Sequence, residues 1–260
     1  MILYVITYER MPEIRNWDGQ TYDRISGPMQ ALGQAVLDRL TLAGDETVLD
    51  VGCGSGRITE MLMRRLPRGK VIAVDMSESM VAAARERLGP DADIRRVDLL
   101  ELDLDEPVDA ILSTATFHWI ADHEALFRRL HAALRPGGRL IAQCGGEGNI
   151  TKLRGRAATV VDRAPYAEHF RDWRAPWNYA NVADTEARLR AAGFVAAECW
   201  LAPAPTQPEH PREFLATIVL GPHVQHLPEQ LRDPFMDEVM IELGEPVVVD
   251  YVRLNIDATA

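Results

Sequence analysis

A glycine-rich loop between a strand pattern and a helical pattern constrains this chain more than any other feature. Residues 47–51 read as a buried strand, and a helix is expected over about 57–66. Between them lie Gly52, Gly54 and Gly56. Glycine lets the backbone approach a ligand closely, and the start of a helix offers free N–H groups. The loop therefore predicts a small-molecule site at a strand-to-helix turn.

The rest of the chain alternates between short β-branched runs and helical periodicity. Strands are expected at 47–51, 70–75, 94–97, 110–113, 139–143, 194–201 and 247–256, and helices at 28–40, 57–66, 77–88, 122–134, 184–192, 211–220 and 228–243. Between residues 145 and 181 this alternation of strands and helices is interrupted. The alternation predicts an α/β fold, doubly wound around a mostly parallel sheet.

The length and net charge of the chain limit the number of domains and the kinds of partner. The 260 residues are enough for one full-sized core, so we expect one domain over 17–260, after a leader at 1–16 with Met11 as an alternative start. The formal net charge of -11 disfavours nucleic acid and anionic membranes as partners. No apolar run is long enough for a membrane span. We expect the protein to bind a small molecule and no metal.

Cysteine usage indicates the compartment. Cys53, Cys144 and Cys199 form no CxxC pair and are odd in number, which is typical of reduced thiols in the cytoplasm. The sequence leaves the oligomeric state open between monomer and homodimer.

The spacing of the loop distinguishes between cofactors. Dinucleotide folds use G-x-G-x-x-G, whereas here Arg57 stands where the last glycine is needed. Asp50, just before the loop, suits a ligand that carries an ammonium or sulfonium charge better than a pyrophosphate. Asp75 ends the next strand, where a carboxylate can accept both ribose hydroxyls. A dehydrogenase is therefore disfavoured.

Together these residues resemble the class I S-adenosylmethionine-dependent methyltransferases. The resemblance rests on the motif of residues 50–56, on Asp75, on residues 97–99 and on the turn at 134–138. It implies a Rossmann-like sheet of seven strands with the last antiparallel, and S-adenosyl-L-methionine as cofactor. The cofactor-binding residues that it implies are Asp50, Gly52, Cys53, Gly54, Gly56, Asp75, Met76, Asp98, Leu99, Ser113 and Thr114. Asp98 and Leu99 would meet the adenine, Met76 would pack on its face, and the backbone after Ser113 would hold the methionine part.

A second, looser resemblance concerns the acceptor, which is the molecule that receives the methyl group. Residues 116–123 and the pair Trp17-Asp18 resemble the trans-aconitate methyltransferase-like group, whose members esterify a small carboxylic acid. The resemblance places the acceptor near His118, the candidate catalytic residue. The residues expected to bind the acceptor are Trp17, Tyr22, Trp119, Trp173, Arg174 and Trp177. Residues 145–181 would form a helical lid insertion on the acceptor side.

The role of His118 depends on the acceptor. A carboxylate is already ionised near neutral pH and needs no general base, whereas a phenol or an amine often does. His118 is therefore either a base or a hydrogen-bonding residue. Two other functions stay open: methylation of a phenol or amine, and non-catalytic binding of S-adenosylmethionine. The identity of the acceptor and its oxygen, nitrogen or carbon nucleophile also stay open.

Overall fold

The structure is a computed structural model that describes residues 24–25 and 27–260. The expected leader at 1–16 and two expected acceptor residues, Trp17 and Tyr22, lie outside this range.

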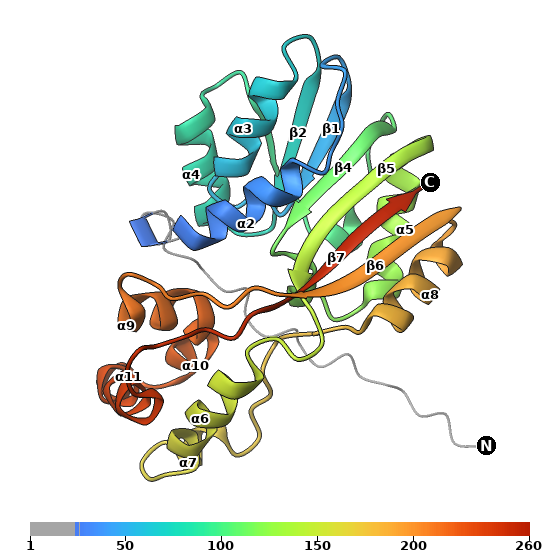
Figure 1. The fold of residues 1–260 in the computed structure, drawn as a ribbon. Coiled ribbons are helices and arrows are strands. Elements are labelled where there is room, and N and C mark those ends of the chain that lie inside the picture. Colours follow the sequence, from blue (N-terminus) through green and yellow to red (C-terminus); the bar gives the residue numbers. More distant parts are fainter. Residues whose placement is uncertain (1–23, 26) are drawn as a thin grey trace, which may run out of the picture.

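The core element is a mixed seven-stranded sheet in the order β3-β2-β1-β4-β5-β7-β6 (Figure 1). The strands are β1 (Thr47–Val51), β2 (Lys70–Asp75), β3 (Asp93–Arg96), β4 (Val108–Thr114), β5 (Leu134–Gly145), β6 (Ala196–Pro203) and β7 (Val252–Thr259). Strands β1 to β5 pair in parallel, and β7 runs antiparallel to both of its neighbours. The predicted doubly wound, mostly parallel sheet with an antiparallel last strand is confirmed.

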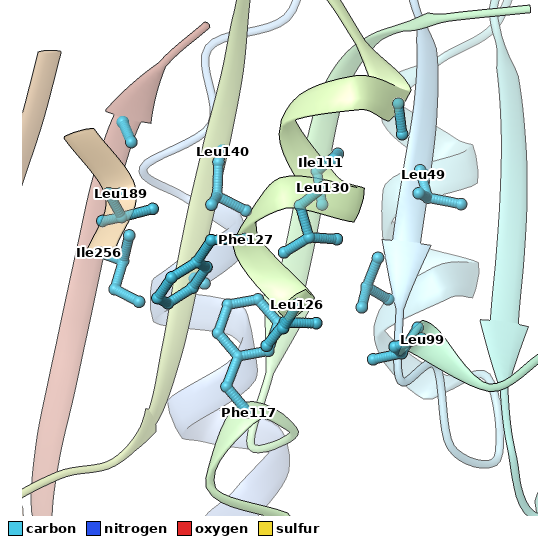
Figure 2. Close-up of a cluster of buried hydrophobic side chains, with 14 of the residues drawn as sticks. Leu49, Leu99, Ile111, Phe117, Leu126, Phe127, Leu130, Leu140, Leu189 and Ile256 are labelled. Carbon is cyan, nitrogen blue, oxygen red and sulfur yellow. The ribbon is translucent and has the colours of Figure 1, made fainter. Parts of the chain in front are cut away.

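Helices cover both faces of the sheet, as expected for parallel strands that are buried on both sides. On one face lie α2 (Gly27–Leu37), α3 (Arg57–Arg65) and α4 (Glu78–Leu88), and on the other η1 (Leu99–Glu101), α5 (His123–Ala133) and α8 (Val182–Ala192). Alternation along β4 divides the side chains between the faces, so Leu112 points to α2 and α3 while Ile111 points to α5. Figure 2 shows Leu126, Phe127 and Leu130 of α5 packed toward the strands.

A second hydrophobic core lies beyond the carboxyl end of β5 (Figure 1). It is built by α6 (Thr151–Val161), α7 (Ala167–Phe170), α9 (Pro211–Phe214), the π-helical turn η3 (Leu215–Val219), α10 (Gly221–His226) and α11 (Glu229–Leu243). We call these elements the cap. The expected insertion at 145–181 supplies only α6 and α7. The remaining cap helices come from 211–243, because Phe214 and Phe235 complete the apolar interior that Tyr166 and Phe170 begin.

The last strand begins later than its apolar pattern predicts. The sequence indicated a strand over 247–256, whereas β7 spans Val252–Thr259. Val247, Val249 and Tyr251 are buried in the cap instead, and Val249 forms an isolated antiparallel bridge with Thr206. The apolar residues of 247–256 are therefore divided between two cores. The chain passes from the cap to the sheet just before Arg253.

Candidate functional site

The glycine loop takes the backbone conformation that its sequence predicts. Gly52, Gly54 and Gly56 all have φ in the left-handed region, at 73°, 55° and 82°. The N–H groups of Gly52 and Cys53 donate to the Val74 carbonyl at 2.8 and 3.0 Å, which fixes the loop against the end of β2. A Cβ on Gly52 would lie 2.0 Å from the Thr116 hydroxyl oxygen, whereas a Cβ on Gly54 would meet nothing within 4 Å. Gly52 is thus needed for packing, and Gly54 borders open space that a ligand can use.

Asp75 lies against this loop at the end of β2. One of its carboxylate oxygens accepts the Gly54 N–H at 2.9 Å, and the other accepts the Ser77 N–H at 2.8 Å. Burial raises the pKa of Asp75 above its usual value, although these N–H groups oppose the shift. Each carboxylate oxygen has a further lone pair, so both can still accept a ribose hydroxyl. The residues present therefore fit a nucleoside.

Asp50 is hydrogen-bonded to helix α3, which follows the loop. It is 1% exposed, and its carboxylate accepts the Thr59 hydroxyl of α3 at 2.6 Å. Burial raises its pKa to about 6, and the charge of Asp75 adds to this shift. Asp50 can therefore act on a bound cation through its field. Its assignment to cofactor binding stays a prediction.

The residues expected around the adenine lie near one another after β2 and β3. Asp98 caps η1, its carboxylate accepting the Leu100 N–H at 2.9 Å. The side chain of Leu99 is buried in the sheet core (Figure 2), so only its backbone is available to a ligand. Met76 is half-buried, and the thiol of Cys53 is buried with its pKa raised as a result. The adenine contacts themselves stay predictions.

The end of β4 turns sharply beside the loop. The Ser113 hydroxyl donates to the Val51 carbonyl at 2.8 Å, and the Thr114 carbonyl accepts the Thr116 hydroxyl at 3.1 Å. Ala115 follows with φ of 58°, an uncommon value for a residue with a side chain. Such strain is typical of functional turns. Here the turn places η2 (Phe117–Trp119) at the carboxyl end of the sheet.

His118 of η2 is 8% exposed and has a defined hydrogen bond. The Gly145 N–H donates to its Nδ1 at 3.3 Å, so Nδ1 is an acceptor and the proton of the neutral ring is on Nε2. Burial lowers the pKa of His118 well below its usual value, and the nearby Arg253 guanidinium adds to the effect. Near neutral pH His118 is therefore a neutral hydrogen-bond donor through Nε2.

Aromatic rings surround His118. Its ring centroid lies 5.1 Å from that of Trp119 and 5.9 Å from that of Tyr179. Trp177 stacks on Tyr179 at 5.9 Å and lies 6.2 Å from Trp119. Two expected acceptor residues, Trp119 and Trp177, are thus brought together with His118 from segments nearly 60 positions apart in the chain. Phe117 packs in the core instead.

The other two expected acceptor residues within the described range lie elsewhere. Trp173 packs against Phe170 and His223, with centroids 5.3 and 4.6 Å away, so it belongs to the aromatic interior of the cap. Arg174 is exposed, and no hydrogen bond, ion pair or ring contact among the described residues links it to His118. Their roles at the acceptor stay predictions.

Two residues beside His118 were missed by the sequence analysis. Tyr179 is half-buried, and its hydroxyl is hydrogen-bonded to Asn149. Burial raises its pKa to about 12, so the phenol is neutral. Arg253 is 3% exposed, and its Nε donates to Gln143 Oε1 at 3.3 Å. The available signal for Arg253 was a charge within an apolar strand pattern.

Residues 24–25 and 27–260 contain neither a metal-binding cluster nor a membrane-spanning helix. That part of the chain has no group of three or more histidine, cysteine, aspartate or glutamate side chains placed to hold a metal. It also has no helix with the length and apolarity that crossing a membrane requires.

Comparisons with known proteins show the family of this chain. Residues 48–138 match the model of a methyltransferase domain. The trans-aconitate 2-methyltransferase of Variovorax paradoxus is 33% identical over 258 residues, which cover 92% of this chain and 94% of the relative. The enzyme of the same name from Paracidovorax citrulli is 31% identical, with 93% and 95% covered.

Solved structures share the fold. The phosphoethanolamine N-methyltransferase 2 of Haemonchus contortus in complex with S-adenosyl-L-methionine has a TM-score of 0.59 at 21% identity, covering 93% of this chain and 56% of that one. A mycolic acid cyclopropane synthase in complex with S-adenosylhomocysteine has a TM-score of 0.61 at 15% identity, with 94% and 96% covered. The chain belongs to the trans-aconitate 2-methyltransferase family, within the class I S-adenosylmethionine-dependent methyltransferases.

Proposed function

We propose that this methyltransferase converts a small carboxylic acid to its methyl ester. The observation that carries the proposal is the state of His118. Its Nδ1 already accepts the Gly145 N–H, and its pKa is far below neutral, so the ring is a weak base. Its Nε2–H can donate to an oxygen of the acceptor. An acceptor that arrives ionised needs this kind of partner, because it has no proton to lose.

The chain's own residues supply orientation and charge. When bound, S-adenosylmethionine supplies an electrophilic methyl group, and Asp75 with the N–H groups of the glycine loop would hold its nucleoside. His118 holds the acceptor oxygen, and the rings of Trp119 and Trp177 exclude water. Orientation of two bound reactants can supply about 7 to 11 kcal/mol of the barrier. The positive guanidinium of Arg253 favours an anionic acceptor over a cationic one.

The carboxylic-acid substrate is proposed on the basis of the relatives as well as of the site. Both relatives compared above are trans-aconitate 2-methyltransferases, so trans-aconitate is the first acid to test. We further propose the cap as the acceptor-side lid and the cytoplasm as the compartment. The absence of a nucleic-acid partner and the choice between monomer and homodimer stay predictions.

The test is transfer of a labelled methyl group from S-adenosylmethionine to a panel of small acids, phenols and amines. We expect label in an ester, which mild base releases as methanol. We also expect kcat to be flat from about pH 6 to pH 9, since neither His118 nor a carboxylate titrates there. A base-stable product formed only with phenols or amines, with a rate that rises with pH, would contradict the proposal.

A further inference from the structure

The peptide groups on both sides of His118 are held by residues from other elements. The Phe117 carbonyl, in the peptide group before His118, accepts the ring N–H of His123 Nε2 at 2.9 Å. The His118 carbonyl, in the peptide group after it, accepts the backbone N–H of Asn178 at 2.8 Å. Because each peptide group is planar, holding both of them restricts φ and ψ of His118. His123 and Asn178 therefore set the direction in which the His118 side chain leaves the backbone.

His123, in the first turn of α5, has one favoured protonation state. It is 3% exposed, and its Nε2 carries the proton because a carbonyl can only accept a hydrogen bond. Burial lowers the pKa of His123 below its usual value, although the bond to Phe117 opposes the shift. Its Nδ1 is buried without a hydrogen-bond partner among the described residues, so a second proton there would be unsatisfied. His123 is therefore a neutral donor directed at η2.

Asn178 also binds the residues that follow η2, through its side chain. Its Nδ2 donates to the Ile120 carbonyl at 3.3 Å and to the Ala121 carbonyl at 3.0 Å. With its backbone N–H on His118, this one residue donates to three carbonyls within residues 118–121. All three bonds need a donor at position 178, and an aspartate side chain there would offer only acceptors.

Hydrophobic packing anchors η2 but leaves the turn before it strained. Phe117 is 1% exposed and packs edge-on against Phe127 of α5, with ring centroids 5.9 Å apart (Figure 2). Two positions before Phe117, Ala115 has φ of 58°, in the left-handed region. A strained turn of this kind persists only where its surroundings hold it. The hydrogen bonds from His123 and Asn178 hold it on the side away from the core.

We propose that His123 and Asn178 are positioning residues for His118, which direct its Nε2–H toward the oxygen of the acceptor. The inference rests on the proposed function, in which that N–H donates to the acceptor. The Gly145 N–H meets His118 Nδ1 at 3.3 Å only while η2 keeps its place. The tautomer of His118 is therefore expected to depend on the same two residues.

The first test replaces Asn178 by alanine or by aspartate, which has the same shape but no donor. We expect Asn178→Ala to lower kcat about fivefold, the equivalent of one hydrogen bond, and to leave the KM for S-adenosylmethionine unchanged. Asn178→Asp should lower kcat further, because its oxygens repel the carbonyls of 120 and 121. The control is Asn181→Ala, which removes the cap of α8 and should lower stability without lowering kcat.

The second test uses the position of the donor nitrogen in His123. Glutamine places its amide nitrogen close to where Nε2 lies, whereas asparagine places it close to Nδ1. We expect His123→Gln to retain kcat and His123→Asn to lower it about fivefold, because only the first keeps the bond to Phe117. His131→Asn, at the other end of the same helix, is the control and should not lower kcat. Equal kcat values for His123→Gln and His123→Asn would contradict a role for this bond.

A double variant tests whether Asn178 acts through His118. In the His118→Gln background, Asn178→Ala should cause no further loss of kcat, because the residue that it positions is already gone. Losses of kcat that multiply would show that Asn178 acts independently of His118 and would overturn the proposal.

Nuclear magnetic resonance of ¹⁵N-labelled histidine rings gives a readout that needs no turnover. We expect the proton of His118 on Nε2 in the native protein and a mixture of tautomers in Asn178→Asp. If kcat and the tautomer are unchanged in the variants, the positioning role is wrong while esterification can still hold. If the tautomer changes as expected but no acid is ever methylated, the positioning role is right and the proposed function is wrong.

Discussion

The proposed cofactor edge and the proposed acceptor side of this enzyme are built in opposite ways. The cofactor edge comes from one stretch of about 50 residues, from β1 to η1, and backbone hydrogen bonds such as Gly52 N–H to Val74 O hold it. The acceptor side is assembled from η2, the end of β5, residues near Tyr179 and the start of β7. The first can therefore be recognised from local sequence. The second exists only when the sheet and the cap are folded together.

Both regions contain buried titratable groups. The group at the cofactor edge is an acid, whereas those on the acceptor side are bases. At the cofactor edge, Asp50 is buried with its pKa raised to about 6, so its ionised form costs stability above that pH. On the acceptor side, His118 and His223 are buried with depressed pKa values, so their protonation costs stability in acid. The two regions are hence expected to respond to pH in opposite directions, and mutations can separate them.

The largest effect is expected for Gly52→Ala. The new Cβ would lie 2.0 Å from the Thr116 hydroxyl oxygen, at a φ of 73° that disfavours side chains. Overpacking and left-handed strain together should lower the free energy of unfolding by about 3 kcal/mol or more. Urea unfolding measures this change.

Gly54→Ala is the matched control for that variant. Its φ of 55° carries a similar strain, but its Cβ would meet nothing within 4 Å. We expect a loss of only about 1 to 2 kcal/mol in stability. Its affinity for S-adenosylmethionine should nevertheless fall sharply in calorimetry, because the methyl group would occupy ligand space. Unchanged affinity would show that the cofactor does not approach Gly54.

Asp50→Asn should stabilise the protein above pH 6. The native pKa of about 6 exceeds the ordinary value of 3.8, so the folded protein binds a proton that the unfolded chain releases between these values. Stability therefore falls as pH rises from 4 to 6 and stays lower above it, by about 3 kcal/mol at most. The amide oxygen can still accept the Thr59 hydroxyl.

Urea unfolding at pH 4 and pH 8 tests the Asp50 prediction, with Asp45→Asn as the exposed control of equal charge change. We expect Asn at position 50 to raise stability at pH 8 and to leave it nearly unchanged at pH 4. We also expect it to weaken cofactor binding, because the negative field near the sulfonium is lost. Loss of stability at pH 8 would show that the charge itself supports the fold.

Asp75→Ala should weaken the binding of S-adenosylmethionine by about 2 kcal/mol, from loss of hydrogen bonds to the ribose. Calorimetry measures this, and Glu78→Ala is a control because Glu78 is an exposed acid in the next helix. Unchanged affinity for Asp75→Ala would mean that another residue binds the ribose.

His223→Phe probes the cap. The ring of His223 is stacked on Phe235, and its Nδ1 is buried without a hydrogen-bond partner among the described residues. Burial lowers its pKa to about 3, so below the unfolded value of about 6.5 the unfolded chain takes up a proton that the folded protein refuses. The variant lacks this cost, and we expect it to gain about 2 kcal/mol at pH 5 and little at pH 8. An equal change at both values would exclude titration of His223 as the cause.

The smallest effect is expected for His118→Gln. Glutamine can still donate a hydrogen bond to a carboxylate, so kcat should fall less than about tenfold and cofactor affinity should not change. Loss of a general base typically costs about a hundredfold or more. Steady-state kinetics with the acid that the enzyme methylates separates the two outcomes. A large loss of kcat that recovers as pH rises would assign His118 as a base.

Much of the fold and the conformation of the glycine loop could be predicted from the sequence. The seven strands and the antiparallel last strand followed from the resemblance, and the glycine loop from its own spacing, whereas the strand order came only from the structure. The helical cap was only partly anticipated, because the apolar faces of 145–181 and 211–243 pack together across 29 intervening positions. The proposed role of Trp173 at the acceptor rests on residue type alone and stays a prediction.

The sequence by itself determined the conformation and chemistry of the cofactor loop, because left-handed glycines, a strand-ending acid and a helix start are specified within one short segment. Only the tertiary structure decided what surrounds His118. The tautomer of His118 depends on an N–H from β5, and Arg253 reaches Gly145 because β7 inserts antiparallel beside that strand. Such neighbours are set by long-range pairing and by the packing of the cap, which no local pattern of residues encodes.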